Sequence, residues 1–178
     1  MIEISRLSRQ YEVHRLGDPD ADAILELCQS NQQYYQYSET EPTKEQVLND
    51  LHITPPGITP ADKYYVGFYR GNDLIAVMDL IDGYPEKDIG YIGFFMMNKA
   101  LQGQGIGTSI VKEVAAYLKT TGKTSIRLAI DKENPQSTYF WKKNGFVAIK
   151  ETDRNGWTML VAEQELFSGS IIEHPADQ

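Results

Sequence analysis

The 178-residue chain contains a single cysteine, Cys28, and only three histidines. One cysteine excludes a disulfide within the chain and fits a reducing compartment, so we expect a cytoplasmic protein. We interpret Cys28 as a small buried hydrophobe on a helix. His14 and His52 stand apart from any cysteine, and no His/Cys set has metal-ligand spacing, so we expect no metal.

Long apolar runs and clusters of basic residues are also missing. No run approaches the length of a membrane span, and residues 1–6 do not resemble a signal peptide, so no membrane partner is expected. The formal net charge is −8. Repulsion from phosphates argues against a nucleic-acid partner where no basic patch exists. An acidic surface instead favours a cationic amine as a small-molecule partner.

The length and apolar content are typical of one domain, residues 1–178, with a full hydrophobic core. We place that core at about residues 11–166 and expect terminal extensions at residues 1–10 and 167–178. Hydrophobic periodicity predicts one strand, two helices, three strands, a helix, a strand, a helix and two strands. The expected strands are 12–16, 64–69, 74–81, 89–97, 125–130, 146–152 and 157–162, and the expected helices are 21–31, 45–51, one from 106 that ends at Gly122, and one after Asn134.

The segment from Leu101 to Gly107 has three glycines between an apolar strand and an amphipathic helix. Such a turn lets backbone N–H groups approach a ligand, and a helix N-terminus adds unpaired donors and a positive dipole end. The spacing matches neither a P-loop nor the GxGxxG dinucleotide fingerprint. It indicates a cradle for a diphosphate, or alternatively a turn whose glycines serve only tight geometry.

Written as Gln102-x-x-Gly105-x-Gly107, this run resembles the Q/R-x-x-G-x-G/A signature of the GNAT superfamily of N-acetyltransferases. In that family the loop amides hold the pyrophosphate of coenzyme A. The resemblance implies acetyl-CoA as the cofactor. It also implies the GNAT acyl-CoA N-acyltransferase fold, an α/β (α+β) class in which a mixed sheet of about seven strands has helices on both faces.

A second segment, from Asn134 to Phe146, is similar to the family's N-x-x-A-x-x-x-Y-x-x-x-G-F pattern. Asn134, Gly145 and Phe146 stand at the matching positions. In the family this asparagine touches the pantetheine or phosphate part of the cofactor. Asparagine before proline is also ordinary helix-start chemistry, so Asn134 is alternatively a helix cap, and both roles can hold together.

The resemblance also implies a cofactor site by position. Backbone groups of Phe95 to Met97 should pair with the pantetheine amides, and a strand N–H near Met97 should polarise the thioester carbonyl. Splaying of strand 89–97 from strand 125–130 would make room for that arm. The implied cofactor-binding residues are Phe95, Met96, Met97, Gln102, Gly103, Gln104, Gly105, Ile106, Gly107, Thr108, Asn134, Ser137 and Trp141.

Trp141 departs from the family pattern, because a tyrosine often stands there as the proposed general acid. An indole N–H donates a hydrogen bond but cannot supply a proton at neutral pH. Tyr139 lies about 200° of helix away from Trp141 and should not substitute for it. Coenzyme A can also leave with a proton taken from solvent, so transfer does not require a tyrosine.

The segment 29–43 corresponds to the family region that closes over the acceptor. Tyr34, Tyr37 and Glu41 are our substrate-binding candidates, because tyrosines and carboxylates can hold an ammonium group through cation–π and charge contacts. The alternative is a surface loop whose tyrosines pack on the body of the protein.

Direct transfer requires a neutral acceptor amine, so a base is helpful. Asp79 is the first catalytic candidate, because alternation places it on an apolar strand face where desolvation raises a carboxyl pKa. Alternatively it satisfies a backbone group or pairs with Arg127. Tyr84 is the second candidate, and Glu39 and Glu41 follow.

Two functions from different classes remain. The first is an N-acetyltransferase that moves acetyl from acetyl-CoA to a primary amine of a small molecule by direct attack in a ternary complex. The second is a non-catalytic acyl-CoA-binding or sensing module, which Trp141 suggests and which a cleft plugged by Tyr34, Tyr35 or Phe95 would favour. Homodimers are common in the family, which is an analogy only, so the oligomeric state stays open and a homodimer is possible.

Overall fold

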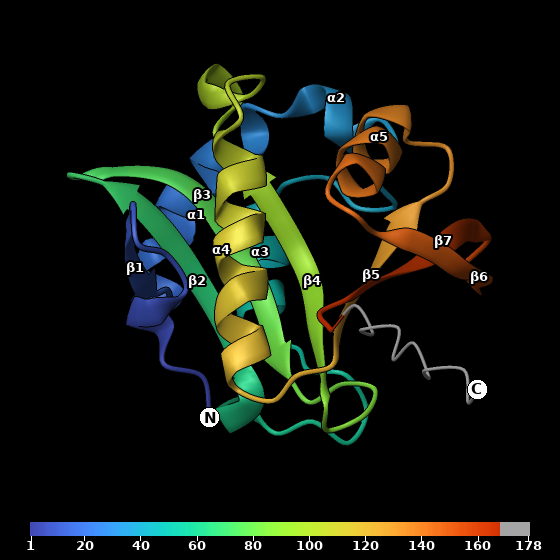
Figure 1. Ribbon diagram of the computed structural model, residues 1–178. Coiled ribbons are helices and arrows are strands. Elements are labelled where there is room, and N and C mark those ends of the chain that lie inside the picture. The colour runs from blue at the N-terminus through green and yellow to red at the C-terminus, as the bar shows by residue number, and fades with distance from the viewer. Residues whose placement is uncertain (168–178) are drawn as a thin grey trace, which may run out of the picture.

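A computed structural model of the chain describes residues 1–167, so all but the first residue of the expected extension 167–178 lies outside the described residues. In residues 1–167, seven strands form one sheet in the order β1-β2-β3-β4-β5-β7-β6 (Figure 1). The strands are β1 (Glu12–Arg15), β2 (Lys63–Arg70), β3 (Asp73–Asp82), β4 (Ile89–Met97), β5 (Ser125–Asp131), β6 (Val147–Arg154) and β7 (Trp157–Glu165). The helices are α1 (Ala21–Gln29), α2 (Gln32–Tyr35), α3 (Lys44–His52), α4 (Ile106–Thr120) and α5 (Pro135–Lys143).

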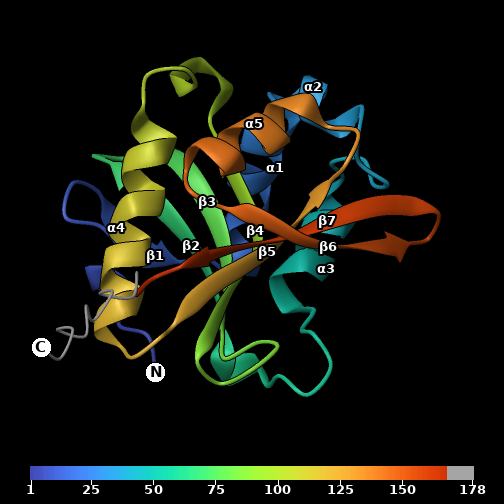
Figure 2. The same ribbon diagram turned by 45° about the vertical axis from the view of Figure 1, so that its right-hand side comes forward.

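Helices cover both faces of this sheet. Figure 1 shows α4 in front of the sheet and α1 and α3 behind it, and Figure 2 shows α5 on the side of α4. The apolar stripe of α4, including Ile110 and Val114, packs in one buried cluster with Phe68, whereas Ile24 of α1 packs in a second cluster with Val77. The expected α/β class with a mixed seven-stranded sheet and two helical layers is confirmed.

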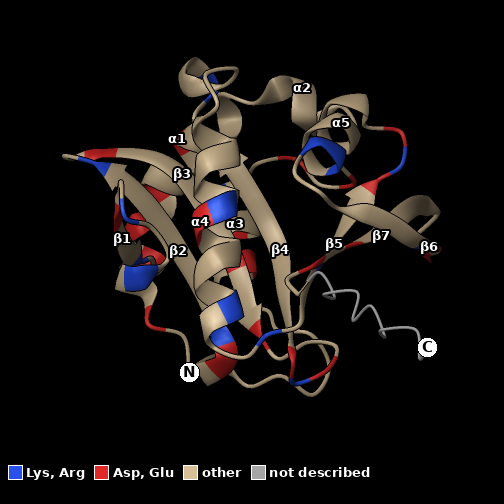
Figure 3. Ribbon diagram, viewed as in Figure 1, with Lys and Arg blue, Asp and Glu red and all other residues tan. Residues whose placement is uncertain are grey.

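The order of long elements also agrees with the sequence pattern, with boundaries within a few residues. One short helix was not expected: α2 lies inside the segment 29–43. No helix of the described chain is both long and apolar enough to cross a bilayer. Lys and Arg are interspersed with Asp and Glu over the drawn elements (Figure 3).

The first ten residues are packed on the core, in contrast to the extension expected from their position. Leu7 has no exposed surface, and Ile2 is also buried in the cluster that contains α4. The Ser8 hydroxyl donates to the Glu113 carboxylate of α4 at 2.5 Å. The core therefore begins near residue 2, because two apolar side chains in this segment reach the space beside α4.

Strands β4 and β5 form the feature that positions the site. They are parallel and pair only from Ile89↔Ser125 to Ile92↔Leu128. On the other side of β4, Ile92 pairs with Leu80 and Phe94 with Asp79, so Gly93 is an extra residue in a β-bulge. Beyond the bulge β4 and β5 are no longer paired. The predicted splaying of these two strands is confirmed.

Candidate active site between two parted strands

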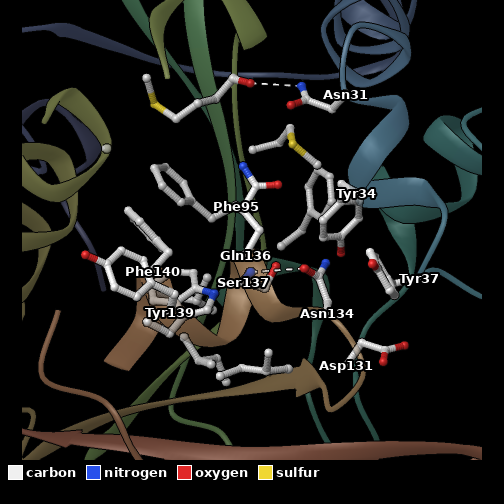
Figure 4. Close-up of a pocket in the computed structure, with 18 of the residues that line it drawn as sticks. Asn31, Tyr34, Tyr37, Phe95, Asp131, Asn134, Gln136, Ser137, Tyr139 and Phe140 are labelled. Carbon is white, nitrogen blue, oxygen red and sulfur yellow. Dashed lines mark hydrogen bonds between the residues drawn. The ribbon is translucent and has the colours of Figure 1, made fainter. Parts of the chain in front are cut away.

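A cavity of about 370 Å³ lies where β4 and β5 part (Figure 4). Its lining is continuous from the glycine-rich loop at residues 101–108, past the end of β4 and the face of α5, to residues 31–38 and the β6–β7 hairpin. Segments far apart in the sequence therefore share one space, with the loop at one end and Tyr34 and Tyr37 near the other.

The glycine-rich loop presents a row of unused backbone donors to this cavity. Gly103 and Gly105 have φ of +76° and +79°, and a Cβ added to either would meet nothing within 4 Å. Gly105 begins α4 without a side-chain cap. Within residues 1–167, the amides of residues 103–108 donate to no protein acceptor, and Ser109 is the first to do so, at 3.0 Å from Gly105 O. These N–H groups and the helix dipole form a site for an anion.

The second helix at the cavity, α5, begins differently. The Asn134 side chain accepts a hydrogen bond from Ser137 N at 3.1 Å and caps the helix. Asn134 is only 2% exposed, yet it lines the cavity together with Ser137. Because α5 has its own side-chain cap and α4 has none, the uncapped helix start at the cavity is that of α4, while Asn134 holds the opposite wall in position.

The end of β4 offers backbone groups to the opening. Asn98 N donates to Ile75 O of β3 at 2.8 Å, so strand alternation turns the backbone of Met97 and Phe95 away from β3 and toward the parted edge. The Met97 carbonyl accepts from Asn31 Nδ2 at 2.9 Å, and Gln102 Nε2 donates to Asn31 Oδ1 at 2.5 Å. The N–H of Met97 and both backbone groups of Phe95 are left for an extended ligand.

Asn31 was not anticipated from the sequence. It is 3% exposed, and its amide joins the end of α1 to β4 and to the glycine-rich loop. A polar residue at the end of a predicted helix is the only signal it gives, and that signal is shared by many ordinary helix ends.

Aromatic side chains form the wall between β4 and α5. Trp141 is buried and meets Phe95, Phe140 and Phe146 with ring centroids 5.9, 4.9 and 5.0 Å apart. Phe95 also stacks on Phe140 at 6.0 Å. Trp141 is thus an apolar wall, whereas Tyr139 on the same helix is 71% exposed at the cavity rim.

The structure brings together nearly all the residues predicted for cofactor binding. Two of them do not line the cavity: Gln104 is exposed and donates to Ala100 O at 3.3 Å, and Ile106 packs against the core. The residues that do line it are Phe95, Met96, Met97, Gln102, Gly103, Gly105, Gly107, Thr108, Asn134, Ser137 and Trp141.

The acceptor candidates are only partly brought to the cavity. Tyr34 and Tyr37 line it, as expected, but Glu41 is exposed outside the lining, so its assignment to substrate is corrected. Glu39 is occupied by the β6–β7 hairpin: its carboxylate accepts from Asn155 Nδ2 at 2.7 Å and lies 3.7 Å from Arg154 Nε. Tyr91, Asp131 and Arg154 also line the cavity and were not anticipated.

Asp79 is buried beside the cavity and does not line it. Its Oδ2 accepts from Lys63 Nζ at 2.8 Å, while Oδ1 is buried without a hydrogen-bond partner in residues 1–167. Arg127, the partner considered from the sequence, pairs with Glu163 instead. Burial raises the pKa of the Asp79 carboxyl, and the Lys63 ammonium opposes that rise. Gly93 separates Asp79 from the cavity, and a Cβ there would lie 2.8 Å from Asp79 Oδ2.

Tyr84, the second catalytic candidate, lies at the wrong end of the sheet. Its N–H donates to Ile89 O at 3.2 Å, which places it beside the first residue of β4, whereas the cavity loop follows the last. Its ring contacts Tyr91 edge to face at 5.1 Å. Tyr84 is the second residue after β3, in the turn that leads into β4.

Residues 24–146 match the sequence profile of the acetyltransferase (GNAT) family. An acetyltransferase from Thermus thermophilus is 19% identical with a TM-score of 0.70, covering 88% of this chain and 97% of that one. The PaiA N-acetyltransferase from Thermoplasma acidophilum, in complex with coenzyme A, is 18% identical with a TM-score of 0.64, covering 87% and 98%. A spermidine N-acetyltransferase SpeG chimera from Vibrio cholerae and hSSAT is 17% identical with a TM-score of 0.65, covering 88% and 96%. No curated protein sequence matches the chain.

Proposed function

Since the chain belongs to the acetyltransferase (GNAT) family, whose cofactor is acetyl-CoA, we propose that it transfers acetyl from acetyl-CoA to a primary amine of a small molecule. The observation that carries the proposal is the set of unused amides at residues 103–108, of which Gly103, Gly105, Gly107 and Thr108 line the same cavity as Tyr34 and Tyr37. A donor site for an anion and a polar aromatic chamber are thereby joined in one cleft.

Coenzyme A would occupy this lining with the glycines in the conformation that they already have. The amides of residues 103–108 would hold the diphosphate, because they are unpaired and the space beside Gly103 and Gly105 is open. The free backbone groups of Phe95 and Met97 would pair with the pantetheine amides like an added strand. Asn134, with its neighbours on α5, would form the opposite wall. The thioester supplies an activated acetyl group.

Transfer would proceed in a ternary complex. The amine nitrogen forms the new C–N bond, the C–S bond breaks, the nitrogen loses a proton, and the thiolate takes a proton from solvent. The N–H groups of Phe95 and Met97 face the opening and would stabilise the developing oxyanion. Trp141 contributes packing but no proton.

Asp79 is our proposed base, acting through one water at Gly93. Its Oδ2, which also accepts from Lys63, is the carboxylate oxygen that faces Gly93, and Gly93 places no side chain between that oxygen and the cavity. A carboxylate with a raised pKa holds a proton better than a solvated one, which suits an acceptor of protons. We assign Tyr84 no part in transfer.

Acetyl-CoA binding by calorimetry, run beside acceptor-dependent thiol release, tests the proposal. The acceptors are polyamines, amino acids, aminoglycosides and short peptides. Binding with thiol release on a small amine supports an acetyltransferase of the proposed kind. Acetyl-CoA binding without thiol release for any acceptor indicates the non-catalytic sensing module. Thiol release with peptides alone contradicts a small-molecule acceptor. An absence of binding contradicts the assignment of the cradle.

A further inference from the structure

Two opposite charges lie on one face of the sheet at the acceptor end of the cavity. Asp131 of β5 is directly opposite Met159 of β7, which is directly opposite Thr152 of β6. Residues opposite one another in antiparallel strands point to the same face, and so do residues two apart in a strand. Arg154, two residues after Thr152, therefore shares the face of Asp131, and both line the cavity.

The register also sets their separation. Two strand spacings and two residues along β6 place the Cα atoms of Asp131 and Arg154 about 12 Å apart. Figure 4 shows Asp131 and Tyr37 on the same side of the cavity. Within residues 1–167 no ion pair joins Asp131 to Arg154, whose acidic neighbour is Glu39.

Each charge retains binding capacity. Asp131 Oδ1 accepts from Glu133 N at 2.9 Å, while Oδ2 has no hydrogen-bond partner in residues 1–167. Glu39 Oε2 lies 3.7 Å from Arg154 Nε, and the guanidinium donates no hydrogen bond to any residue in the same part of the chain. Two terminal guanidinium nitrogens match the two oxygens of a carboxylate.

We propose that the acceptor carries an ammonium and a carboxylate on one carbon, as in a diamino acid whose second amine is acetylated. The inference rests on the proposed acetyltransferase function and names its substrate class. Asp131 binds the ammonium, Arg154 binds the carboxylate, and Tyr34 and Tyr37 flank the chain between this head group and the reacting amine. The reacting end lies beside Phe95, across the opening between β4 and β5 from Asp131.

Matched acceptors separate the two head-group contacts. The reference acceptor is L-lysine. Compared with it, 1,5-diaminopentane lacks the carboxylate and 6-aminohexanoate lacks the second ammonium. L-Ornithine and L-2,4-diaminobutyrate vary the length of the side chain. We expect the best diamino acid to exceed both truncated analogues at least tenfold in kcat/KM. A smaller difference overturns the inference.

Two variants assign the contacts. Arg154→Gln should lower kcat/KM for the diamino acid 10- to 100-fold and leave 1,5-diaminopentane unchanged, and Asp131→Asn should do the same for the diamino acid and leave 6-aminohexanoate unchanged. Lys150→Gln removes an exposed charge from the same strand outside the cavity and is the control. An equal loss on every acceptor overturns the assignment, because it indicates a structural role.

The same data distinguish failure of the inference from failure of the proposed function. Acetyl-CoA binding and thiol release with some amine, but without preference for the zwitterionic head group, overturn the inference alone. Faster thiol release with a peptide than with any diamino acid would likewise overturn the inference alone. No release with any amine overturns both the inference and the acetyltransferase on which it rests.

Discussion

Substitution of Gly105 by alanine separates the backbone geometry of the glycine-rich loop from its binding of the cofactor. Gly105 has a φ of +79° and precedes α4 at the cavity. Alanine in this left-handed conformation costs about 1–2 kcal/mol. A Cβ there would meet no protein atom within 4 Å, so no steric cost is added to that conformational cost. In a protein of this size the loss corresponds to a Tm lowered by about 2–8 °C.

The effect on binding should be much larger. The added methyl group lies in the open space that we assign to the diphosphate, and it would push the anion away from at least one amide. Loss of one hydrogen bond to a charged group costs about 1.5–3 kcal/mol. We therefore expect acetyl-CoA to bind about 10- to 100-fold more weakly, as measured by isothermal titration calorimetry.

Gly57 provides a matched control. It has a φ of +81°, its added Cβ would also meet nothing within 4 Å, and it does not line the cavity. Gly57→Ala should lose a similar amount of stability and leave acetyl-CoA affinity unchanged. Equal affinities for the two variants would refute the cradle, because they would show that Gly105 serves only the turn.

Four further predictions follow from the contacts described above. Leu7→Ala should lower the free energy of unfolding by about 2–5 kcal/mol in urea titration, since Leu7 is fully buried, and a loss below about 1 kcal/mol would contradict its place in the core. Asn134→Ala removes the helix cap and should lower the free energy of unfolding by about 1 kcal/mol. Asn134→Asp should keep the cap but weaken acetyl-CoA binding, because the new carboxylate repels the anionic cofactor. If Asn134→Asp binds acetyl-CoA as tightly as the unchanged protein, that result would count against a cofactor contact. A base must be ionised, and burial raises the pKa of the Asp79 carboxyl, so the rate of acetyl transfer should fall as the pH drops through that raised pKa. Asp79→Asn should remove this acid limb from the pH–rate profile. An unchanged acid limb in the variant would exclude Asp79 as the base. Burial raises the pKa of the Cys28 thiol, so iodoacetamide should alkylate it slowly at pH 8 in the folded protein and rapidly in urea, and rapid labelling of the folded state would contradict its burial.

The cofactor half of the cavity could be predicted because its signals are local in the sequence. Gly105 and Asn134 each stand at the start of a helix. Apolar periodicity marks the helix after Gly105 and an Asn-Pro start marks the helix after Asn134, so each motif lies within a few residues of the element that positions it. The contacts are made by backbone amides and helix ends, which depend weakly on the rest of the fold. The identity of the family follows from the same two segments.

The missed elements are those whose stability comes from distant partners. Helix α2 spans only Gln32–Tyr35 and has no buried stripe of its own, so periodicity cannot reveal it. Leu7 and Ile2 are isolated apolar residues in a polar segment, and only the presence of α4 beside them shows that they belong to the core. Short pieces without a repeating pattern carry no signal on the chain itself.

The acceptor half depends on contacts that no local pattern records. Glu39 and Asn155 are 116 residues apart in the sequence, and their hydrogen bond decides that Glu39 belongs to the hairpin and is not a free carboxylate in the cavity. Asp79 shows the same dependence: alternation predicted its buried face, but its pairing with Lys63 and its position behind Gly93 follow from the register of β2, β3 and β4. A charge is assigned to substrate only after its protein partners are known, so Arg154 and Asp131 could be recognised only from the folded sheet.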